Sequence, residues 1–406
     1  MDFQLPAEDD PRRLAVREWL AAHPSPTGRD LAQAGFVAPH WPRPWGLAAD
    51  PIHQLVIDDE LSRADVRLPV NPMGTGWGGP TILVGGSQAQ KDRYLWPMLA
   101  GEELWCQLFS EPGAGSDLAN LATRAVLDGD EFVVNGQKIW TTSAEHADLG
   151  ILIARTDVDV PKHKGISYFI CPMRLPGIEV RTITEITGGH HFCEVFFTDV
   201  RIPAANLVGD LHDGWRLAKV TLGNERVSLS TGGVLWGNGP TGLELLDQLR
   251  RAGPLRDPLL RQQAARVHTE HVLLDLIRMR TLSAMSNGQQ PGPEASVRKL
   301  LADEHGQHVM TLARRAVGAD AMLTSLAGDY DPERDGRLLN DQRSGDDLHH
   351  PSWYHGFMFS QALTIGGGTF AVQRNIIGER VLGLPRDEDV TTKMTWSDAQ
   401  RLGNPR

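Results

Sequence analysis

The chain has 406 residues, of which 41% are hydrophobic and 22% charged, and its net charge is -11 because 51 acidic residues outnumber 40 Lys and Arg. This length predicts two or three domains, and an acidic chain without a basic cluster argues against nucleic acid and against a polybasic membrane patch. The cysteines, Cys106, Cys171 and Cys193, are too far apart for a disulfide framework or a Cys-x-x-Cys metal site, which favours a reducing compartment.

The first hundred residues are expected to be helical. The chain begins with an acidic segment that lacks the apolar run of a signal peptide, and no stretch is long and apolar enough for a membrane span. We therefore expect a soluble, cytoplasmic protein. Apolar residues then recur at helical spacing, as over 13–20 and 53–61, with a Pro- and Gly-rich break at 39–46. The pattern predicts an N-terminal α-helical domain over residues 1–105.

A pattern of short strands follows. Ala125–Leu127 and Glu131–Val134 flank a hairpin turn at 128–130, and Asn135-Gly136 is expected to form a second turn. Four further runs are expected as strands: 149–154, 166–171, 178–182 and 194–197. Because no helical pattern lies between them, we expect a middle domain over residues 106–212 with an antiparallel sheet, packed as a sandwich or barrel.

The helical period returns at Gly214-Trp215. Long amphipathic stretches are expected as helices at 215–250, 258–286, 294–317 and 356–383, and the Gly-, Asp- and Arg-rich segment 327–347 as a loop. These helices predict a C-terminal α-helical bundle over residues 213–406. The fold class is therefore α+β, with helices, then a sheet, then helices.

A first candidate site stands where helices give way to strands, at Phe109–Asp117, which reads Phe-Ser-Glu-Pro-Gly-Ala-Gly-Ser-Asp. Two glycines and a serine in a tight turn can present backbone N–H groups and a hydroxyl to an anion such as a pyrophosphate. An ordinary structural turn has the same composition, and by itself the segment favours that interpretation. The chain has neither GxGxxG nor a Walker motif, so a nucleotide would not lie on a doubly wound sheet.

A second candidate site, Gly136–Ser143, follows the hairpin and reads Gly-Gln-Lys-Ile-Trp-Thr-Thr-Ser. An aromatic ring beside hydroxyls can stack on a planar heterocycle and hydrogen-bond to it. Taken alone, a Trp among β-branched residues is ordinary strand composition.

Together the two segments resemble the signature of the acyl-CoA dehydrogenases, a Ser/Thr-Glu-Pro-x-x-Gly-Ser-Asp turn followed by Asn-Gly-x-Lys-x-Trp-x-Thr. The similarity continues in the family's order through the blocks 199–203, 206–209, 214–215 and 368–386. In that family a carboxylate removes the α-proton of an acyl-CoA thioester, the β-hydrogen leaves as a hydride to N5 of FAD, and a trans-2-enoyl-CoA forms. The resemblance implies an FAD-dependent oxidoreductase of lipid metabolism, with an electron-transfer flavoprotein as the acceptor.

The resemblance also implies roles for single residues. Ser110 and Thr142 match the hydroxyls that hydrogen-bond to the isoalloxazine edge, and Trp140 matches the ring that packs on the flavin. The other residues expected to bind FAD are Phe109, Gly115, Ser116, which matches a pyrophosphate contact and is also expected to bind substrate, and Thr369.

The catalytic base is expected at Glu225. Many family members carry a Glu before the C-terminal Gly-Thr, but Gly367 stands there, and a branch that includes isovaleryl-type and long-chain enzymes instead carries a Glu-Arg pair, which matches Glu225-Arg226. Leu222 and Leu229, one turn away on each side, would exclude water from the carboxylate and make it a stronger base. From the residues alone, an exposed Glu on a polar helix face is the alternative. The resemblance further implies that Arg226 contacts CoA or orients the helix, and that the Gly367 N–H polarises the thioester carbonyl together with a flavin ribityl hydroxyl.

Departures from the family concern the neighbouring subunit. The Arg-x-x-Phe-Gly motif that reaches the neighbour's FAD is replaced by the sequence of 250–258, the Phe-Gly-Gly-x-Gly segment by 317–321, and an Arg-Gly-Ser stretch by 188–193. Some actinobacterial relatives that act on bulky steroid-type CoA thioesters look similar here, and some of these are heteromeric. We expect a homodimer or homotetramer, with a heteromer as the alternative.

Two other functions stay open from the sequence. A flavin oxidase or monooxygenase on the same fold would consume oxygen without an added acceptor. A subunit that needs a paralogous partner to complete the FAD site would be colourless when expressed alone. Within the leading function, the Gly366–Gly368 run removes side chains near the reacting carbons and favours a branched, cyclic or bulky acyl group.

No metal is expected. The histidines that could suggest metal ligands are His190-His191 and His349-His350, with His355 nearby. Adjacent side chains point to different sides of a regular element and no acidic partner stands at ligand spacing, so surface or loop positions are expected.

Overall fold

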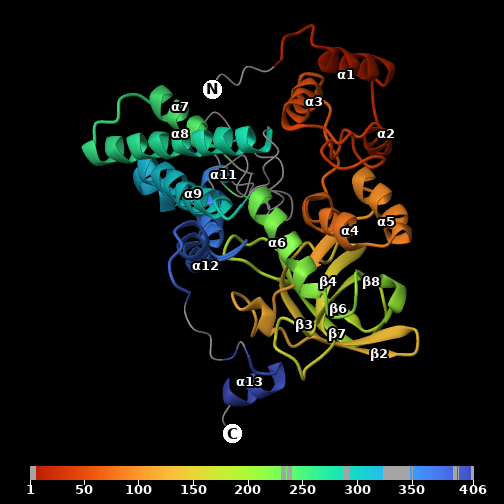
Figure 1. The fold of residues 1–406 in the computed structure, drawn as a ribbon. Coiled ribbons are helices and arrows are strands. Elements are labelled where there is room, and N and C mark those ends of the chain that lie inside the picture. Colours follow the sequence, from red (N-terminus) through yellow and green to blue (C-terminus); the bar gives the residue numbers. More distant parts are fainter. Residues whose placement is uncertain are drawn as a thin grey trace.

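The computed structural model describes residues 6–229, 235, 240–286, 292–322, 348–349, 351–386, 391 and 393–403. The chain forms helices, then a sheet, then a second set of helices, as the sequence predicts (Figure 1). The loop expected at 327–347 lies outside the described residues. Within the described part of the chain, no helix combines the length and the apolar character that crossing a membrane requires.

Four of the N-terminal helices begin with a residue whose side chain accepts a backbone N–H of the first turn. Asp10 and Asp50 each accept a backbone N–H at a helix start that is followed by Pro, and Thr27 and Ser87 form reciprocal capping boxes. The helices are α1 Pro11–Ala22, α2 Gly28–Gln33, α3 Pro51–Arg63, α4 Gly79–Gly85 and α5 Gln88–Ala100, with a π-helical turn, η1, at Pro72–Gly78.

The middle of the chain forms one eight-stranded sheet. Its strands are β1 Trp105–Leu108, β2 Arg124–Asp128, β3 Glu131–Thr142, β4 Leu149–Arg155, β5 Ile166–Pro172, β6 Ile178–Ile183, β7 Phe192–Pro203 and β8 Leu207–Val208. The order is β6-β7-β3-β2-β4-β5-β8, with β1 beside β4. The sheet is mostly antiparallel, but β1 and β2 each pair with β4 in parallel, which the sequence did not predict because neither connection is a hairpin.

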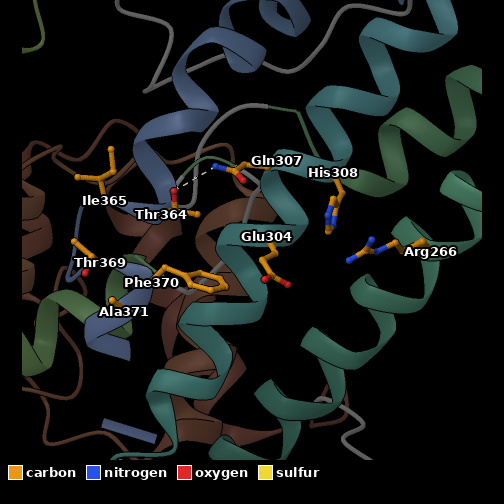
Figure 2. A pocket seen from close by; sticks show the side chains of 9 residues that line it. All are labelled: Arg266, Glu304, Gln307, His308, Thr364, Ile365, Thr369, Phe370 and Ala371. Atoms are coloured by element: carbon orange, nitrogen blue, oxygen red, sulfur yellow. Dashed lines mark hydrogen bonds between the residues drawn. The ribbon is translucent and has the colours of Figure 1, made fainter. Parts of the chain in front are cut away.

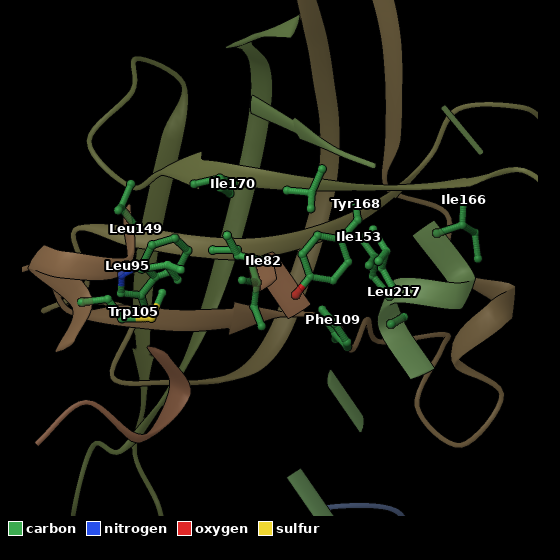
Figure 3. Packing of buried hydrophobic residues seen from close by; sticks show 14 of the residues in the cluster. Ile82, Leu95, Trp105, Phe109, Leu149, Ile153, Ile166, Tyr168, Ile170 and Leu217 are labelled. Atoms are coloured by element: carbon green, nitrogen blue, oxygen red, sulfur yellow. The ribbon is translucent and has the colours of Figure 1, made fainter. Parts of the chain in front are cut away.

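Strands β4 and β5 are covered on both faces. Successive residues of β4 point to opposite faces of the sheet, so that Ile151 belongs to one core and Leu152 to another. The first core packs the sheet against α4, α5 and α6 through Ile82, Leu95 and Leu217 (Figure 3), and the second fills the other face of the sheet. Double coverage explains why these strands read as almost continuous apolar runs.

The second turn expected at Asn135-Gly136 is wrong. The two residues lie inside β3, at a register shift against β7. Gly136 has φ of 153°, and a Cβ there would clash with the Thr123 side chain, while the Asn135 side chain bonds to Asp199. The glycine therefore permits a close crossing at a β-bulge, and the strand does not reverse.

The C-terminal helices differ from two of the expected spans. The helices are α6 Gly214–Leu229, α7 Gly242–Arg251, α8 Pro258–Ser286, α9 Ala295–Val317, α11 Pro351–Phe359, α12 Phe370–Ile376 and α13 Trp396–Gly403. The stretch 215–250 is two helices because Thr241 starts α7 with its own capping box. The stretch 356–383 breaks at Gly366–Gly368, where Gly367 and Gly368 have φ of 68° and 86° and cannot continue a helix. In Figure 1, α6 runs from the sheet towards α9.

Candidate functional site

The two sequence motifs of the middle domain are fastened to each other by a buried ion pair. Lys138 on β3 is fully buried, and its Nζ donates to Glu111 at 2.7 Å and to the Phe109 carbonyl at 2.9 Å. The Ile139 N–H adds a bond to the Ser110 carbonyl at 2.9 Å. The Phe109–Asp117 segment and β3 therefore form one rigid unit, which brings Phe109 and Ser110 beside the Trp140 end of the strand.

Glu111 is also a backbone cap. Its carboxylate accepts from the N–H groups of Ala122 and Thr123 at 2.6 and 3.0 Å. Burial alone would raise the pKa of Glu111, but the Lys138 ammonium and these hydrogen bonds outweigh burial, and the pKa lies below its ordinary value. The Glu and the Lys of the two motifs thus have structural roles that the motifs alone do not reveal.

The turn at Gly113–Asp117 is exposed, apart from the buried Ala114. A Cβ added at Gly113 or Gly115 would meet nothing within 4 Å, and neither residue has a left-handed φ. Packing and backbone strain therefore give no reason for glycine at these positions, whereas the close approach of a ligand does. Ser116 is exposed beside them, and Asp117 pairs with Lys162 at 2.9 Å.

Trp140 stands out from the strand in an unusual backbone conformation. Its φ is 61° at a register shift between β3 and β7, and its side chain is 58% exposed. A bulky residue with left-handed φ is strained and is typical of functional sites. Next to it, Thr142 is half-buried, and the buried Thr141 hydroxyl has no partner among the described residues. A presented ring with hydroxyls beside it is an arrangement that fits a planar heterocycle such as isoalloxazine.

Aromatic rings link this region to the C-terminal helices. Phe192 meets Trp140 edge-on with ring centroids 5.9 Å apart, and it stacks on Phe359 of α11 at 6.5 Å. His191 contacts Phe359 as well, and its Nδ1 lies 3.0 Å from Glu185. This acidic partner is not evident from the sequence, because it reaches His191 only through the turn of the chain at 185–191. Among the described residues no group of side chains could hold a metal ion.

Glu225 lies on the inner side of α6 and is only 8% exposed. The Gln107 amide of β1 donates to it at 3.2 Å. One turn earlier, Thr221 bonds to Thr81 at 2.8 Å and to the Tyr168 hydroxyl at 3.0 Å, which fixes this part of α6 against α4 and β5. The alternative of an exposed Glu on a polar face is therefore wrong.

The neighbours expected around Glu225 are described only in part. Leu222 packs against the first core. The side chains of Leu229 and Arg226 lie outside the described residues, so the role expected for Arg226 stays a prediction.

The glycine turn, defined here as Leu363–Thr369, is held from outside. Lys299 of α9 donates to the Leu363 carbonyl at 3.2 Å and to the Gly366 carbonyl at 3.1 Å. Gln373 of α12 donates to the Gly367 and Gly368 carbonyls at 3.1 and 3.2 Å. Thr369 caps the start of α12, and its hydroxyl accepts from Val372 N–H at 3.3 Å.

A pocket of about 520 Å³ lies beside the glycine turn, between it and helices α8 and α9 (Figure 2). It is lined by Arg266, Glu304, Gln307, His308, Thr364, Ile365, Thr369, Phe370 and Ala371. Of the site residues that the sequence predicts, only Thr369 lines this pocket.

Besides Glu225 on α6, two groups of predicted site residues can be distinguished. Phe109, Ser110, Trp140 and Thr142 gather where the Phe109–Asp117 segment meets β3, whereas Gly367 and Thr369 are supported by α9 and α12. Helix α9 packs against both α6 and α12 and so joins the turn to the helix of Glu225.

The sequence matches three family models. They are the acyl-CoA dehydrogenase N-terminal domain over residues 9–102, the middle domain over 106–200 and the C-terminal domain over 212–382. Two relatives from Mycobacterium tuberculosis (strain ATCC 25618 / H37Rv) are acyl-CoA dehydrogenase FadE34, 41% identical, and acyl-CoA dehydrogenase IpdE1, 38% identical, each over 88% of this chain. The chain spans 46% of the length of FadE34 and 87% of that of IpdE1.

Two solved structures have the same fold. The Tcur3481-Tcur3483 steroid ACAD is 28% identical with a TM-score of 0.74, and the ChsE4-ChsE5 complex from Mycobacterium tuberculosis is 30% identical with a TM-score of 0.72. Each match covers 95% of this chain and 100% of the other chain.

Proposed function

The chain belongs to the acyl-CoA dehydrogenase family, whose members are FAD-binding oxidoreductases, and on this premise we propose that it dehydrogenates the Cα–Cβ bond of an acyl-CoA thioester with Glu225 as the base. The observation that carries the proposal is a nearly buried carboxylate at the family's Glu-Arg position, in a chain whose other base position is Gly367.

In this proposal Glu225 takes the α-proton. The Gln107 amide orients the carboxylate, and the anchoring of Thr221 to Thr81 and Tyr168 keeps the helix from moving away from the substrate. The Gly367 N–H donates to the thioester carbonyl and stabilises the negative charge that develops on its oxygen. FAD, when bound, accepts the β-hydrogen as a hydride, and the product is a trans-2-enoyl-CoA.

The residues of the middle domain fit FAD. Trp140 offers an exposed ring, Ser110 and Thr142 offer hydroxyls, and Gly115 and Ser116 offer an uncrowded turn for a phosphate group. Phe109 is buried in the first core and is proposed to line the flavin site through its backbone, and Thr369 is proposed to add a contact from the C-terminal helices. Ser116 and Arg226 are proposed to contact the CoA portion of the substrate.

Replacement of the base tests the proposal. Glu225→Gln should keep the yellow colour of the bound flavin and slow its bleaching by acyl-CoA by about 100- to 10,000-fold. Glu194→Gln is the matched control, because Glu194 is a half-buried carboxylate on β7 that also accepts from a glutamine amide and has no proposed role in proton transfer. If Glu225→Gln bleaches as fast as the unchanged protein, Glu225 is not the base.

We propose a wide acyl pocket for branched, cyclic or bulky acyl groups. Its support is the absence of side chains at Gly366–Gly368, together with the name steroid ACAD carried by one similar structure. Anaerobic bleaching with a panel of short straight-chain, branched and cyclic acyl-CoAs tests this pocket, and a strict preference for short straight chains contradicts it.

An electron-transfer flavoprotein is the proposed acceptor, tested by adding it to the reduced enzyme.

A second candidate is a subunit that shares its FAD site with a paralogous partner. The missing Arg-x-x-Phe-Gly motif favours it, as does the similarity to a chain of the ChsE4-ChsE5 complex. Purification alone and together with a paralogue distinguishes the two states. Colourless protein that turns yellow only with the partner supports the shared site, and a yellow homo-oligomer contradicts it.

A further inference from the structure

The sequence of the glycine turn does not by itself hold the turn in one conformation. Three successive glycines, Gly366–Gly368, have more conformational freedom to lose than any other tripeptide, so the turn needs restraint from outside. A loosely held N–H is also a poor donor to a substrate, because displacement by about 1 Å can slow a reaction about 100-fold.

Lys299 supplies that restraint from helix α9. Its side chain is fully buried, and Asp303, one turn later and 1% exposed, binds the ammonium with both carboxylate oxygens, at 2.8 and 2.6 Å. The same Nζ donates to the Leu363 and Gly366 carbonyls. The ammonium therefore has four acceptor atoms, two of them in the backbone of the turn.

The bond to Gly366 has a consequence for Gly367. The Gly366 carbonyl and the Gly367 N–H belong to the same planar trans peptide unit and point in opposite directions. Once Lys299 holds the carbonyl, the N–H of Gly367 is directed away from α9. Gln373 holds the next peptide unit in the same manner through the Gly367 carbonyl.

We propose that Lys299, with Asp303 as its counter-ion, is a positioning residue that aims the Gly367 N–H at the thioester carbonyl. The inference rests on the proposed function of Gly367 and extends it to a residue that touches neither substrate nor cofactor. Asp303 holds the ammonium in place and supplies the charge that makes its burial tolerable.

A pair of variants separates positioning from folding. Lys299→Met leaves Asp303 without its partner, whereas the double variant Lys299→Met/Asp303→Leu removes both charges and restores an apolar interior. Arg13→Met is the control, because it breaks a buried ion pair with Glu60 in the N-terminal helices, away from the turn. All are studied as FAD-loaded full-length protein.

The first readout is amide hydrogen exchange in the peptide 363–370, which includes the bonds of Ile365 and Gly366 N–H to the Ala362 carbonyl. The second is the split between kcat and KM for the acyl-CoA that the unchanged enzyme uses fastest. We expect exchange at least about tenfold faster in both Lys299 variants, and kcat lower by about 10- to 100-fold with KM changed less than about threefold. The double variant should regain its melting temperature but neither its slow exchange nor its kcat.

Three outcomes overturn the proposal. The double variant recovers exchange and kcat together with its melting temperature, or Arg13→Met speeds exchange in the turn equally, or the Lys299 variants leave the turn and kcat unchanged. If none of the acyl-CoAs reduces the flavin of the unchanged protein, the proposed function fails. The exchange measurement still decides whether Lys299 holds the turn.

Discussion

Two buried lysines hold two turns that are proposed to contact ligands, one in the middle domain and one among the C-terminal helices. Lys138 ties the Phe109 carbonyl to β3 with Glu111 as its counter-ion, and Lys299 ties the Leu363 and Gly366 carbonyls to α9 with Asp303. Both lysines are fully buried. In each case one ammonium neutralises a buried carboxylate and fixes backbone next to a proposed ligand.

The two lysine clamps, Lys138 with Glu111 and Lys299 with Asp303, differ in the pKa of the carboxylate that serves as the counter-ion. Glu111 accepts two backbone N–H groups besides Lys138, and its pKa lies below the ordinary value despite burial. For Asp303, burial outweighs Lys299 and raises the pKa to about 6. The middle-domain clamp therefore keeps its charges in mild acid, whereas the clamp of the glycine turn loses the charge of Asp303.

The largest effect should come from breaking the stronger clamp. Lys138→Met leaves Glu111 buried and without its cation, which should lower the free energy of unfolding by about 3–5 kcal/mol and abolish flavin binding. Urea denaturation and the flavin absorbance of the purified protein measure the two effects. Arg201→Met removes an exposed pair with Asp128 and should change stability by less than about 1 kcal/mol. Equal losses in both variants would contradict the special role of Lys138.

The pH dependence of stability should distinguish the two counter-ions. Because the pKa of Asp303 is raised from 3.8 to about 6, the folded state holds this proton more tightly than the unfolded chain does. Its contribution is complete below about pH 4 and is lost as the pH rises through 6, up to about 3 kcal/mol.

Urea denaturation of the unchanged protein and of Asp303→Asn between pH 4 and 7 tests this sign. The unchanged protein should lose stability relative to Asp303→Asn as the pH rises. Glu111 has the opposite sign, since its lowered pKa gives stability that is lost as the pH falls. A constant difference between the two proteins would mean that Asp303 does not titrate in this range.

A smaller effect is expected from replacing a glycine by alanine, and its size should differ between the two turns. Gly368 has φ of 86°, and a Cβ there would lie 2.8 Å from Gln373 Nε2, so Gly368→Ala should destabilise the protein by roughly 1–2 kcal/mol. Gly115→Ala meets no atom and should stay within about 0.5 kcal/mol, yet it should weaken flavin binding. Thermal unfolding and flavin titration of both variants measure the contrast. Tight flavin binding by Gly115→Ala would remove the reason given for that glycine.

The smallest stability effect is expected at the exposed ring. Trp140→Ala removes a side chain that is 58% exposed, so the FAD-free protein should change by less than about 1 kcal/mol. Flavin affinity should still fall at least about tenfold, the equivalent of about 1.4 kcal/mol of binding free energy. Fluorescence titration with FAD measures this loss. Large destabilisation without loss of affinity would assign Trp140 to the fold.

Periodicity alone was enough to predict the order of helices, sheet and helices, and the motifs were enough to identify the family. The burial of Glu225 was expected from Leu222, which does pack against a core. Lys299 and Asp303 could not be singled out from the sequence, because a Lys and an Asp one helical turn apart among other charged residues are also typical of an exposed pair. Their importance depends on Leu363 and Gly366, which are more than 60 residues away.

Local sequence determined which segments become helices or strands, because side-chain periodicity and capping act over a few residues. It also determined the motif chemistry, since a Gly-rich turn and a Trp-Thr-Thr strand carry their donors and rings with them. Only the tertiary structure decided that Asn135-Gly136 is a bulge, that β1 lies parallel to β4, and that two lysines share one task. Such features arise from contacts between distant segments, where burial removes water and makes each remaining charge and carbonyl depend on a partner from another element.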